Sequence, residues 1–103
     1  MKTDHLVPQL GQLVKVVQGR ERGQFAVIIK ILDDKYVLLA DGDKRKYDRP
    51  KKKSINHIEL LKNISPEVRD SLLETNRVSN GKLRFAVAKI ANEHVTEIEK
   101  GDQ

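Results

Sequence analysis

The densest cluster of charge in the chain is the segment Lys44–Lys53, KRKYDRPKKK, in which seven of ten residues are basic. Only Asp48 opposes them, so the segment carries a net charge of +6 (seven positive charges and one negative). Arg45 and Arg49 can each hold a phosphate with two parallel hydrogen bonds, whereas the lysines act as point charges. Contact with phosphates also releases counterions, which gives affinity that does not depend on sequence. The segment therefore predicts binding to a nucleic-acid backbone, and the alternative is a solvated basic loop without a dedicated partner.

A second group of charges lies in the segment Gly19-Arg20-Glu21-Arg22-Gly23, where two arginines stand between two glycines. Glycine adopts backbone conformations that other residues resist, so this spacing is typical of a sharp reversal. Arg20 and Arg22 would project from the reversal into solvent, where phosphates can meet them. The alternative is an ordinary surface turn in which Glu21 pairs with its neighbours.

Tyr47 lies inside the basic segment and could stack on an unpaired base. The other interpretation, which we favour, is that this tyrosine covers a barrel. Gly19, Gly23 and Gly42 are expected to shape the loops. The predicted nucleic-acid contacts are Lys15, Arg20, Arg22, Lys44, Arg45, Lys46, Tyr47, Arg49, Lys51, Lys52 and Lys53.

The whole chain has 20 basic and 15 acidic residues, a net charge of +5. Residues 1–62 hold 14 basic and 8 acidic residues (+6), whereas residues 63–103 hold 6 and 7 (−1). The excess of positive charge thus belongs to the first part of the chain, as expected for a face that binds a polyanion. There are no cysteines, which excludes a disulfide framework or a thiolate metal site. No apolar run approaches the roughly 20 residues of a membrane span.

Catalytic and metal-binding patterns are weak. His5, His57 and His94 are scattered without ligand spacing, and Glu93 and Glu97 fall four residues apart on a polar helical face. Gly19 and Gly23 lack the spacing and the following Lys-Ser/Thr of a phosphate-binding loop. We therefore expect no enzyme activity, no metal and no cofactor, and an enzyme acting on RNA is the least favoured hypothesis.

The elements that must position these side chains begin as short strands. The predicted strands cover Leu13–Val17, Phe25–Leu32 and Lys35–Ala40, where β-branched and other apolar residues dominate. Asp41-Gly42 then predicts a tight hairpin, so a fourth strand should begin near Asp43 and carry residues 44–47. A basic loop at 48–54 contains Pro50, and a fifth strand is expected at 55–61.

After Lys62 the pattern becomes helical. Ser65-Pro66-Glu67 combines an N-cap, a proline at the first helical position and an early acid, and this helix should end near Asn76. A second helix should open at Ser79-Asn80-Gly81; a strand at residues 83–87 is the alternative. Its apolar stripe of Leu83, Val87, Ile90 and Ile98 is expected to pack on the strands, and Phe25 and Phe85 are expected in the core.

The segment from Gly11 to Gly23, GQLVKVVQGRERG, resembles the KOW motif that a group of ribosomal proteins and transcription elongation factors share. LDDKYVLLADG at 32–42 and RPKKK at 49–53 are similar to the small KOW proteins of the archaeal and eukaryotic large-subunit type known as fourteen-e. The resemblance covers roughly residues 9–62 and nothing from Ser65 onward. One departure is Ala26, which stands where KOW motifs commonly have a glycine, so the loop exit is expected to differ in shape.

The resemblance implies an SH3-like barrel, RNA as the ligand and the ribosome as the context. We therefore expect a mainly β protein with an N-terminal lead at 1–8, a KOW barrel at 9–62 and a two-helix extension at 63–103. The expected function is non-catalytic and cytoplasmic: binding to ribosomal RNA of the large subunit through the basic hairpin and loop. The alternative is a protein-interaction module whose C-terminal helices bind a partner in the translation or transcription machinery.

Overall fold

The computed structural model describes residues 7–101, with side chains as far as residue 93. Five antiparallel strands in the order β4-β3-β2-β1-β5 form one sheet, and two helices follow. The elements are β1 (Gln12–Val16), β2 (Phe25–Ile31), β3 (Tyr36–Ala40), β4 (Lys51–Ser54), the 3₁₀ turn η1 (Ile55–His57), β5 (Ile58–Ile64), α1 (Pro66–Thr75) and α2 (Asn80–Gly101). The predicted fold class, a mainly β KOW barrel with two C-terminal helices, is confirmed.

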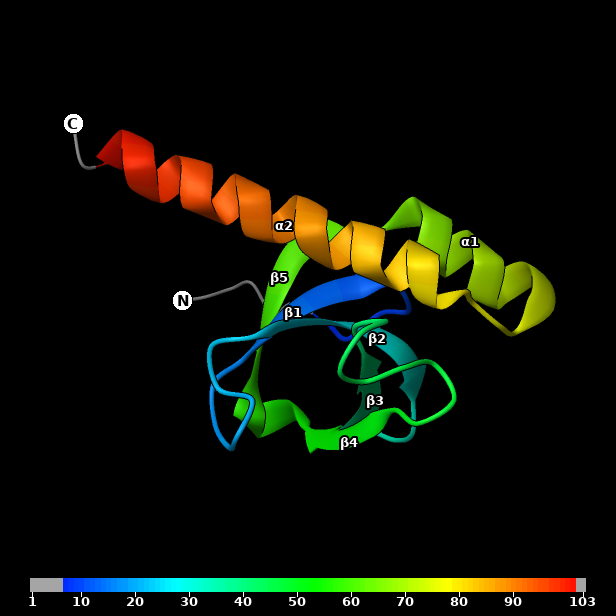
Figure 1. Ribbon diagram of the computed structural model, residues 1–103. Coiled ribbons are helices and arrows are strands. Elements are labelled where there is room, and N and C mark those ends of the chain that lie inside the picture. Colours follow the sequence, from blue (N-terminus) through cyan, green and yellow to red (C-terminus); the bar gives the residue numbers. More distant parts are fainter. Residues whose placement is uncertain (1–6, 102–103) are drawn as a thin grey trace.

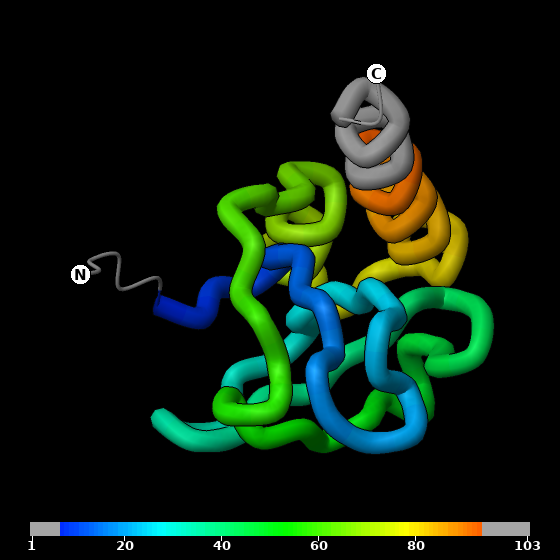
Figure 2. Tube along the Cα trace, turned by 90° about the vertical axis from the view of Figure 1, so that its left-hand side faces the viewer, coloured from blue at the N-terminus to red at the C-terminus, as the bar shows by residue number. Residues whose placement is uncertain are grey.

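The sheet curls into a barrel because η1 joins β4 to β5, the strands at its two edges (Figure 1). The view turned by 90° shows the strands wrapped around a common centre (Figure 2). That centre is filled by side chains from alternate strand positions, which are Val14, Val16, Ala26, Ile28, Val37, Leu39 and Ile58. Burial of these apolar groups, at about 25 cal/mol per Å², is the main force that closes the barrel.

A second core lies outside the barrel, between β1–β3 and the two helices. Val27 and Ile29 of β2 point toward the helices, whereas their neighbours Ala26 and Ile28 point into the barrel. Since β2 is buried on both faces, its sequence is almost continuously apolar rather than alternating. Figure 1 shows α2 lying across this side of the sheet.

The apolar stripe of α2 packs on the strands, as expected for the part of it whose side chains are described. Leu83 is 0% exposed and Ile90 is 9% exposed, and Val87 packs against the same core. Ile98 and its neighbours lie outside the described side chains. The prediction that Phe85 is a core residue is wrong, because it is 59% exposed. Two positions after Leu83, it falls on the opposite side of the helix.

Three strands are confirmed to within one residue at each end, but the fourth predicted strand is wrong. Residues 43–47 lie in a loop, and β4 begins only at Lys51. The fifth predicted strand is correct from Ile58, whereas the residues before it form η1 because the Ser54 hydroxyl accepts the Asn56 N–H at 3.1 Å.

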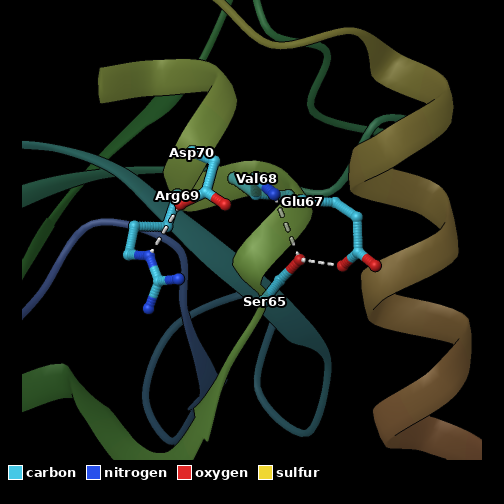
Figure 3. Close-up of polar contacts among 5 residues, drawn as sticks. All are labelled: Ser65, Glu67, Val68, Arg69 and Asp70. Carbon is cyan, nitrogen blue, oxygen red and sulfur yellow. Dashed lines mark hydrogen bonds and ion pairs between the residues drawn. The ribbon is translucent and has the colours of Figure 1, made fainter. Parts of the chain in front are cut away.

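The predicted start of α1 is confirmed, with Ser65 as N-cap and a proline in the first turn. The Ser65 hydroxyl accepts the Val68 N–H at 3.2 Å and donates to Glu67 at 3.3 Å (Figure 3). The helix ends as predicted at Asn76, which adopts a left-handed conformation with φ of 63°. A short link joins α1 to α2, which begins at Asn80. The predicted second helix is therefore confirmed, and the alternative of a strand at 83–87 is wrong.

The turn between β2 and β3 is closed by the side chain of Asp33. Its carboxylate accepts the N–H groups of Lys35 and Tyr36, each at 2.8 Å. These two bonds hold the pKa of Asp33 below its ordinary value of 3.8. Within residues 7–101, no helix has the length and apolar character that crossing a membrane requires. Most of the predicted lead, residues 1–6 with His5, lies outside the described residues, as does the side chain of His94.

Candidate nucleic-acid interface

The loop Gly19–Gly23 reverses the chain between β1 and β2. Gly19 and Gly23 have φ of 100° and 91°, a region that other residues enter at a cost. The Gly23 N–H donates to the Val16 carbonyl at 2.7 Å, and the Arg22 N–H donates to the Gly19 carbonyl at 3.2 Å. These bonds close the reversal and leave the side chains of Arg20 and Arg22 exposed, as the sequence predicts.

The exit from this loop needs no third glycine. Ala26 is 8% exposed and belongs to the barrel core. Among residues 7–101 the one non-glycine residue with a positive φ is Asn76, so Ala26 has an ordinary backbone conformation. The departure from the KOW pattern is therefore accommodated by packing a small side chain.

Residues 41–50 form the second basic loop, in place of the predicted tight hairpin. The Asp41 carboxylate accepts the N–H groups of Asp43 and Arg45, each at 2.8 Å. The N–H groups of Asp41 and Gly42 both donate to the Arg45 carbonyl, at 2.8 and 3.0 Å. Because these groups are used within the loop, they are not available for a strand ladder. Lys44, Lys46 and Arg49 are exposed on it, and Arg45 is half-buried.

The second basic loop is fastened to the start of α2. The Tyr47 N–H donates to the Asn80 side-chain oxygen at 2.7 Å, and the Tyr47 hydroxyl donates to the Asn76 carbonyl at 3.0 Å. The Arg84 guanidinium donates to the Gly42 carbonyl at 2.8 Å. A side chain at Gly42 would collide with the Asn80 carbonyl, so only glycine fits here. Tyr47 is half-buried against the helix-side core, outside the barrel, and its stacking on a base stays a prediction.

Lys51, Lys52 and Lys53 lie on a strand, and their predicted place in a loop is wrong. In β4 they pair with Leu39, Leu38 and Val37 of β3, so alternate lysines point to opposite faces. Lys52 lies on the outer face, with its ammonium 4.6 Å from the centre of the Tyr36 ring. Lys53 lies on the inner face and is 8% exposed. The run of three lysines is therefore divided between two surfaces.

Glu21 brings the two basic loops together. Its carboxylate lies 3.9 Å from the Arg45 guanidinium and 3.8 Å from the Lys53 ammonium. The acid thus pairs with residues far away in sequence, and no ion pair joins it to Arg20 or Arg22 among the described residues. A small hollow beside it is lined by the polar residues Gln24, Asp41, Arg45, Lys51 and Lys53, with apolar side chains of β1–β3 beneath.

The structure places Arg45, Lys51 and Lys53 around one hollow beside Glu21, and it separates two of the predicted contact residues from them. We call the exposed and half-buried basic residues of the two loops, together with Lys51, the basic interface: Arg20, Arg22, Lys44, Arg45, Lys46, Arg49 and Lys51. Lys53 lies beneath it as a buried cation. Lys52 is on the other face of β4, and Lys15 is half-buried in the middle of β1, opposite Glu59 of β5.

The contribution of α2 was missed by the sequence reasoning, which gave the helical part no role at the basic residues. Asn80 and Arg84 hold the second basic loop in place. One signal was available: the first turn of α2 contains no acid. Helix starts favour acids because of the helix dipole. A first turn without an acid therefore suggests that its side chains have another role, which here is contact with the loop.

No cluster of three or more metal-ligating side chains occurs in the described part of the chain. The chemistry that the interface offers is binding of anions through guanidinium and ammonium groups.

Comparison with known proteins agrees with this geometry. A family model described as the KOW motif matches residues 10–41, which contain β1, the first basic loop, β2 and β3. The chain is 44% identical over 71 residues to YbzG of Bacillus subtilis, a proposed ribosome-binding protein, covering 69% of this chain and 96% of that protein. It is 32% identical over 80 residues to large ribosomal subunit protein eL14 of Hyperthermus butylicus, covering 75% of this chain and 82% of that protein.

Proposed function

Because this chain belongs to the family of KOW-motif proteins that includes large ribosomal subunit protein eL14, we propose that it is a non-catalytic, ribosome-associated RNA-binding protein. Its ligand in this proposal is ribosomal RNA of the large subunit, which places its work in translation and in the cytoplasm. The names of both relatives connect them with the ribosome, and this supports the proposal.

The observation that carries the proposal is the convergence of two basic loops from separate parts of the sequence. Glu21 of the first loop lies within 3.9 Å of Arg45 of the second, so their exposed cations share one side of the barrel. A contiguous set of arginines and lysines suits a phosphate backbone, which carries a regular row of charges. The chain has only two Tyr, two Phe and no Trp, so we expect recognition of folded RNA by backbone and shape rather than by base stacking.

The first test is a salt series of binding to purified large ribosomal subunits and to protein-free ribosomal RNA. If about five phosphates are neutralised, the logarithm of affinity should fall with the logarithm of salt concentration at a slope of about −3.5 to −4.5. An affinity that does not change with salt would overturn the electrostatic mechanism.

The second test asks whether the position of the charges matters. Lys44, Lys46 and Arg49 are exposed in the second basic loop, and a triple alanine variant should lose about 10- to 100-fold in affinity and flatten the salt slope by about two to three. The matched control changes Lys35, Lys62 and Lys89 to alanine, which removes the same charge from exposed positions outside the interface. Equal losses in the two variants would show attraction by net charge alone.

A second candidate function is docking on a protein through α2. Phe85 is 59% exposed on this helix and lines a hollow together with Leu13, Ala86 and Ile90. In that case Phe85→Ala would weaken binding to whole subunits and leave binding to protein-free RNA unchanged. The apolar stripe beside it offers less support, because Leu83 and Ile90 are used in the core.

A further inference from the structure

We propose that Lys53, Arg45 and Lys51 form a subsite for one phosphate group of RNA, and that Glu21 occupies this subsite when RNA is absent. The inference rests on the proposed function and assigns a role to Glu21. It concerns the hollow at the base of the Gly19–Gly23 loop. A second acid, Asp41, also lines the hollow, but its carboxylate accepts the N–H groups of Asp43 and Arg45 within its own loop.

The first observation is a lysine side chain that is largely buried. The Lys53 side chain is 9% exposed, because it shares the inner face of the barrel with Val37. A side chain at Gly19 would come within 2.7 Å of the Lys53 Nζ, so the absence of a side chain there makes room for the charge. The Nζ atom itself keeps contact with solvent, because the described residues contain no fully buried side-chain nitrogen or oxygen that lacks a hydrogen-bond partner. A cation that is partly shielded from water in this way interacts with a nearby anion more strongly than one on the open surface.

The second observation is that the partner of this ammonium is loosely placed. Glu21 Oε1 lies 3.8 Å from Lys53 Nζ, and Glu21 Oε2 lies 3.9 Å from the Arg45 guanidinium. Charge-assisted hydrogen bonds between such groups are normally about 2.7–2.9 Å long. One carboxylate therefore lies between two cations without a close bond to either. The two cations keep donors that a second anion can use.

A phosphate matches this arrangement better than a carboxylate does. Its oxygens point in tetrahedral directions, so one group can accept from the Arg45 guanidinium and from two ammonium groups at once. Lys51 lines the same hollow and brings the number of cations around it to three, with Lys53 and Arg45. Val16, Ala26 and Leu39 lie beneath, which lowers the local polarity and strengthens each charge interaction.

Glu21 can leave without disturbing the loop. The reversal is closed by backbone bonds, from Gly23 N–H to the Val16 carbonyl and from Gln24 N–H to the Glu21 carbonyl at 2.9 Å. Rotation about the side-chain bonds of Glu21 moves the carboxylate into solvent and keeps both bonds. Glu21 thus stabilises the buried Lys53 in the free protein and competes with weakly binding anions, so that an RNA backbone held by the whole interface displaces it more readily than a single anion does.

The test compares Glu21→Gln with Glu93→Gln, which removes the same charge from an exposed position on α2. Glu21→Gln should strengthen binding to ribosomal RNA by about three- to tenfold, whereas Glu93→Gln should change it by less than about twofold. The gain should vanish when Lys53→Met is also present. Arg45→Gln, at a half-buried position, provides a second background if Lys53→Met fails to fold. Equal effects of the two glutamine variants would overturn the subsite.

A titration with inorganic phosphate separates this inference from the proposed function. Amide NMR shifts in Glu21→Gln should move at residues 19–23 and 51–53, and the same titration of Glu93→Gln should require a higher phosphate concentration. If these shifts appear but no variant binds RNA, the subsite stands and the RNA function fails. If RNA binds but the shifts spread evenly over the surface, the subsite is wrong and the RNA function stands.

Discussion

The two basic loops carry similar charges but are held by different means. The Gly19–Gly23 loop is closed by its own backbone bonds, and a side chain added at Gly23 would meet nothing within 4 Å. The loop at 41–50 is pressed against α2 at Gly42 and is bonded to it through Tyr47. The first loop is thus a local structure at the end of a hairpin, whereas the second depends on a helix that begins about 40 residues later in the chain.

This difference changes the role of the helical part. Cations bind a phosphate backbone best when their positions are fixed before contact, because ordering them on binding costs free energy. The start of α2 fixes the more basic of the two loops, through side-chain bonds of 2.7 and 2.8 Å from Asn80 and Arg84. In the proposed function, the helices contribute to RNA binding through the loop that they hold. Four predictions test the comparison of the two loops.

The largest effect is expected from alanine at two matched glycines. Gly42 and Gly23 have φ of 82° and 91°, so alanine at either position should cost about 1–2 kcal/mol of unfolding free energy from backbone strain. Gly42→Ala should cost about 1–3 kcal/mol more, because the new side chain meets the Asn80 carbonyl and Arg84. Urea unfolding of the two variants measures the difference. Equal costs would show that contact with α2 does not constrain the second loop.

A smaller effect is expected from Asn80→Ala, which removes the acceptor of the Tyr47 N–H. The loss of this bond should reduce the unfolding free energy by about 1–2 kcal/mol and speed amide exchange at residues 42–49. Affinity for RNA should fall severalfold, although no charge is removed. Asn92→Ala, at an exposed position on the same helix, serves as the control. Unchanged exchange in the loop would contradict the role given to Asn80.

Changes at the tip of the first loop should leave stability almost unaltered. Arg20 and Arg22 are exposed and take part in no ion pair among the described residues. The double alanine variant should stay within about 0.5 kcal/mol of the parent in unfolding free energy. The slope of the logarithm of RNA affinity against the logarithm of salt concentration should become shallower by about 1.5 to 2, because two phosphate contacts are lost. A large drop in melting temperature would show that this loop, too, depends on its side chains.

The smallest effect concerns the β2–β3 turn, which belongs to neither basic loop. Because the pKa of Asp33 is lower in the folded than in the unfolded protein, its charged form stabilises the fold at pH values above the ordinary 3.8. This contribution is lost as the pH falls through the folded pKa. Asp33→Ala should therefore lower the melting temperature slightly at neutral pH and not in strong acid. If the variant still melted at a lower temperature than the parent in strong acid, the effect would come from something other than the carboxylate charge.

The sequence predicted those elements that depend only on residues close together in the chain, namely the Gly19–Gly23 turn, the helix cap and three strands. Ser65-Pro66-Glu67 predicted the start of α1 because capping needs residues only a few positions apart. Gly19 and Gly23 predicted the first loop because a positive φ is a property of single residues. The β1, β2 and β3 strands followed from β-branched apolar runs, and the KOW resemblance joined them into the correct fold.

The second basic loop was decided by contacts that span the chain. Asp41-Gly42 is a strong hairpin signal, yet Gly42 is a glycine here because α2 passes directly over it. The lysine run gave no sign that Lys53 would be buried and Lys52 exposed, since the register of β4 against β3 assigns their faces. Phe85 is a different case, because the sequence could have placed it on the surface: it stands two positions after Leu83 and so lies on the side of the helix opposite the apolar stripe. Residue types and spacing thus specify turns, caps and strands, whereas only the packed structure specifies which charges stand together, because that depends on strand register and helix docking between distant residues.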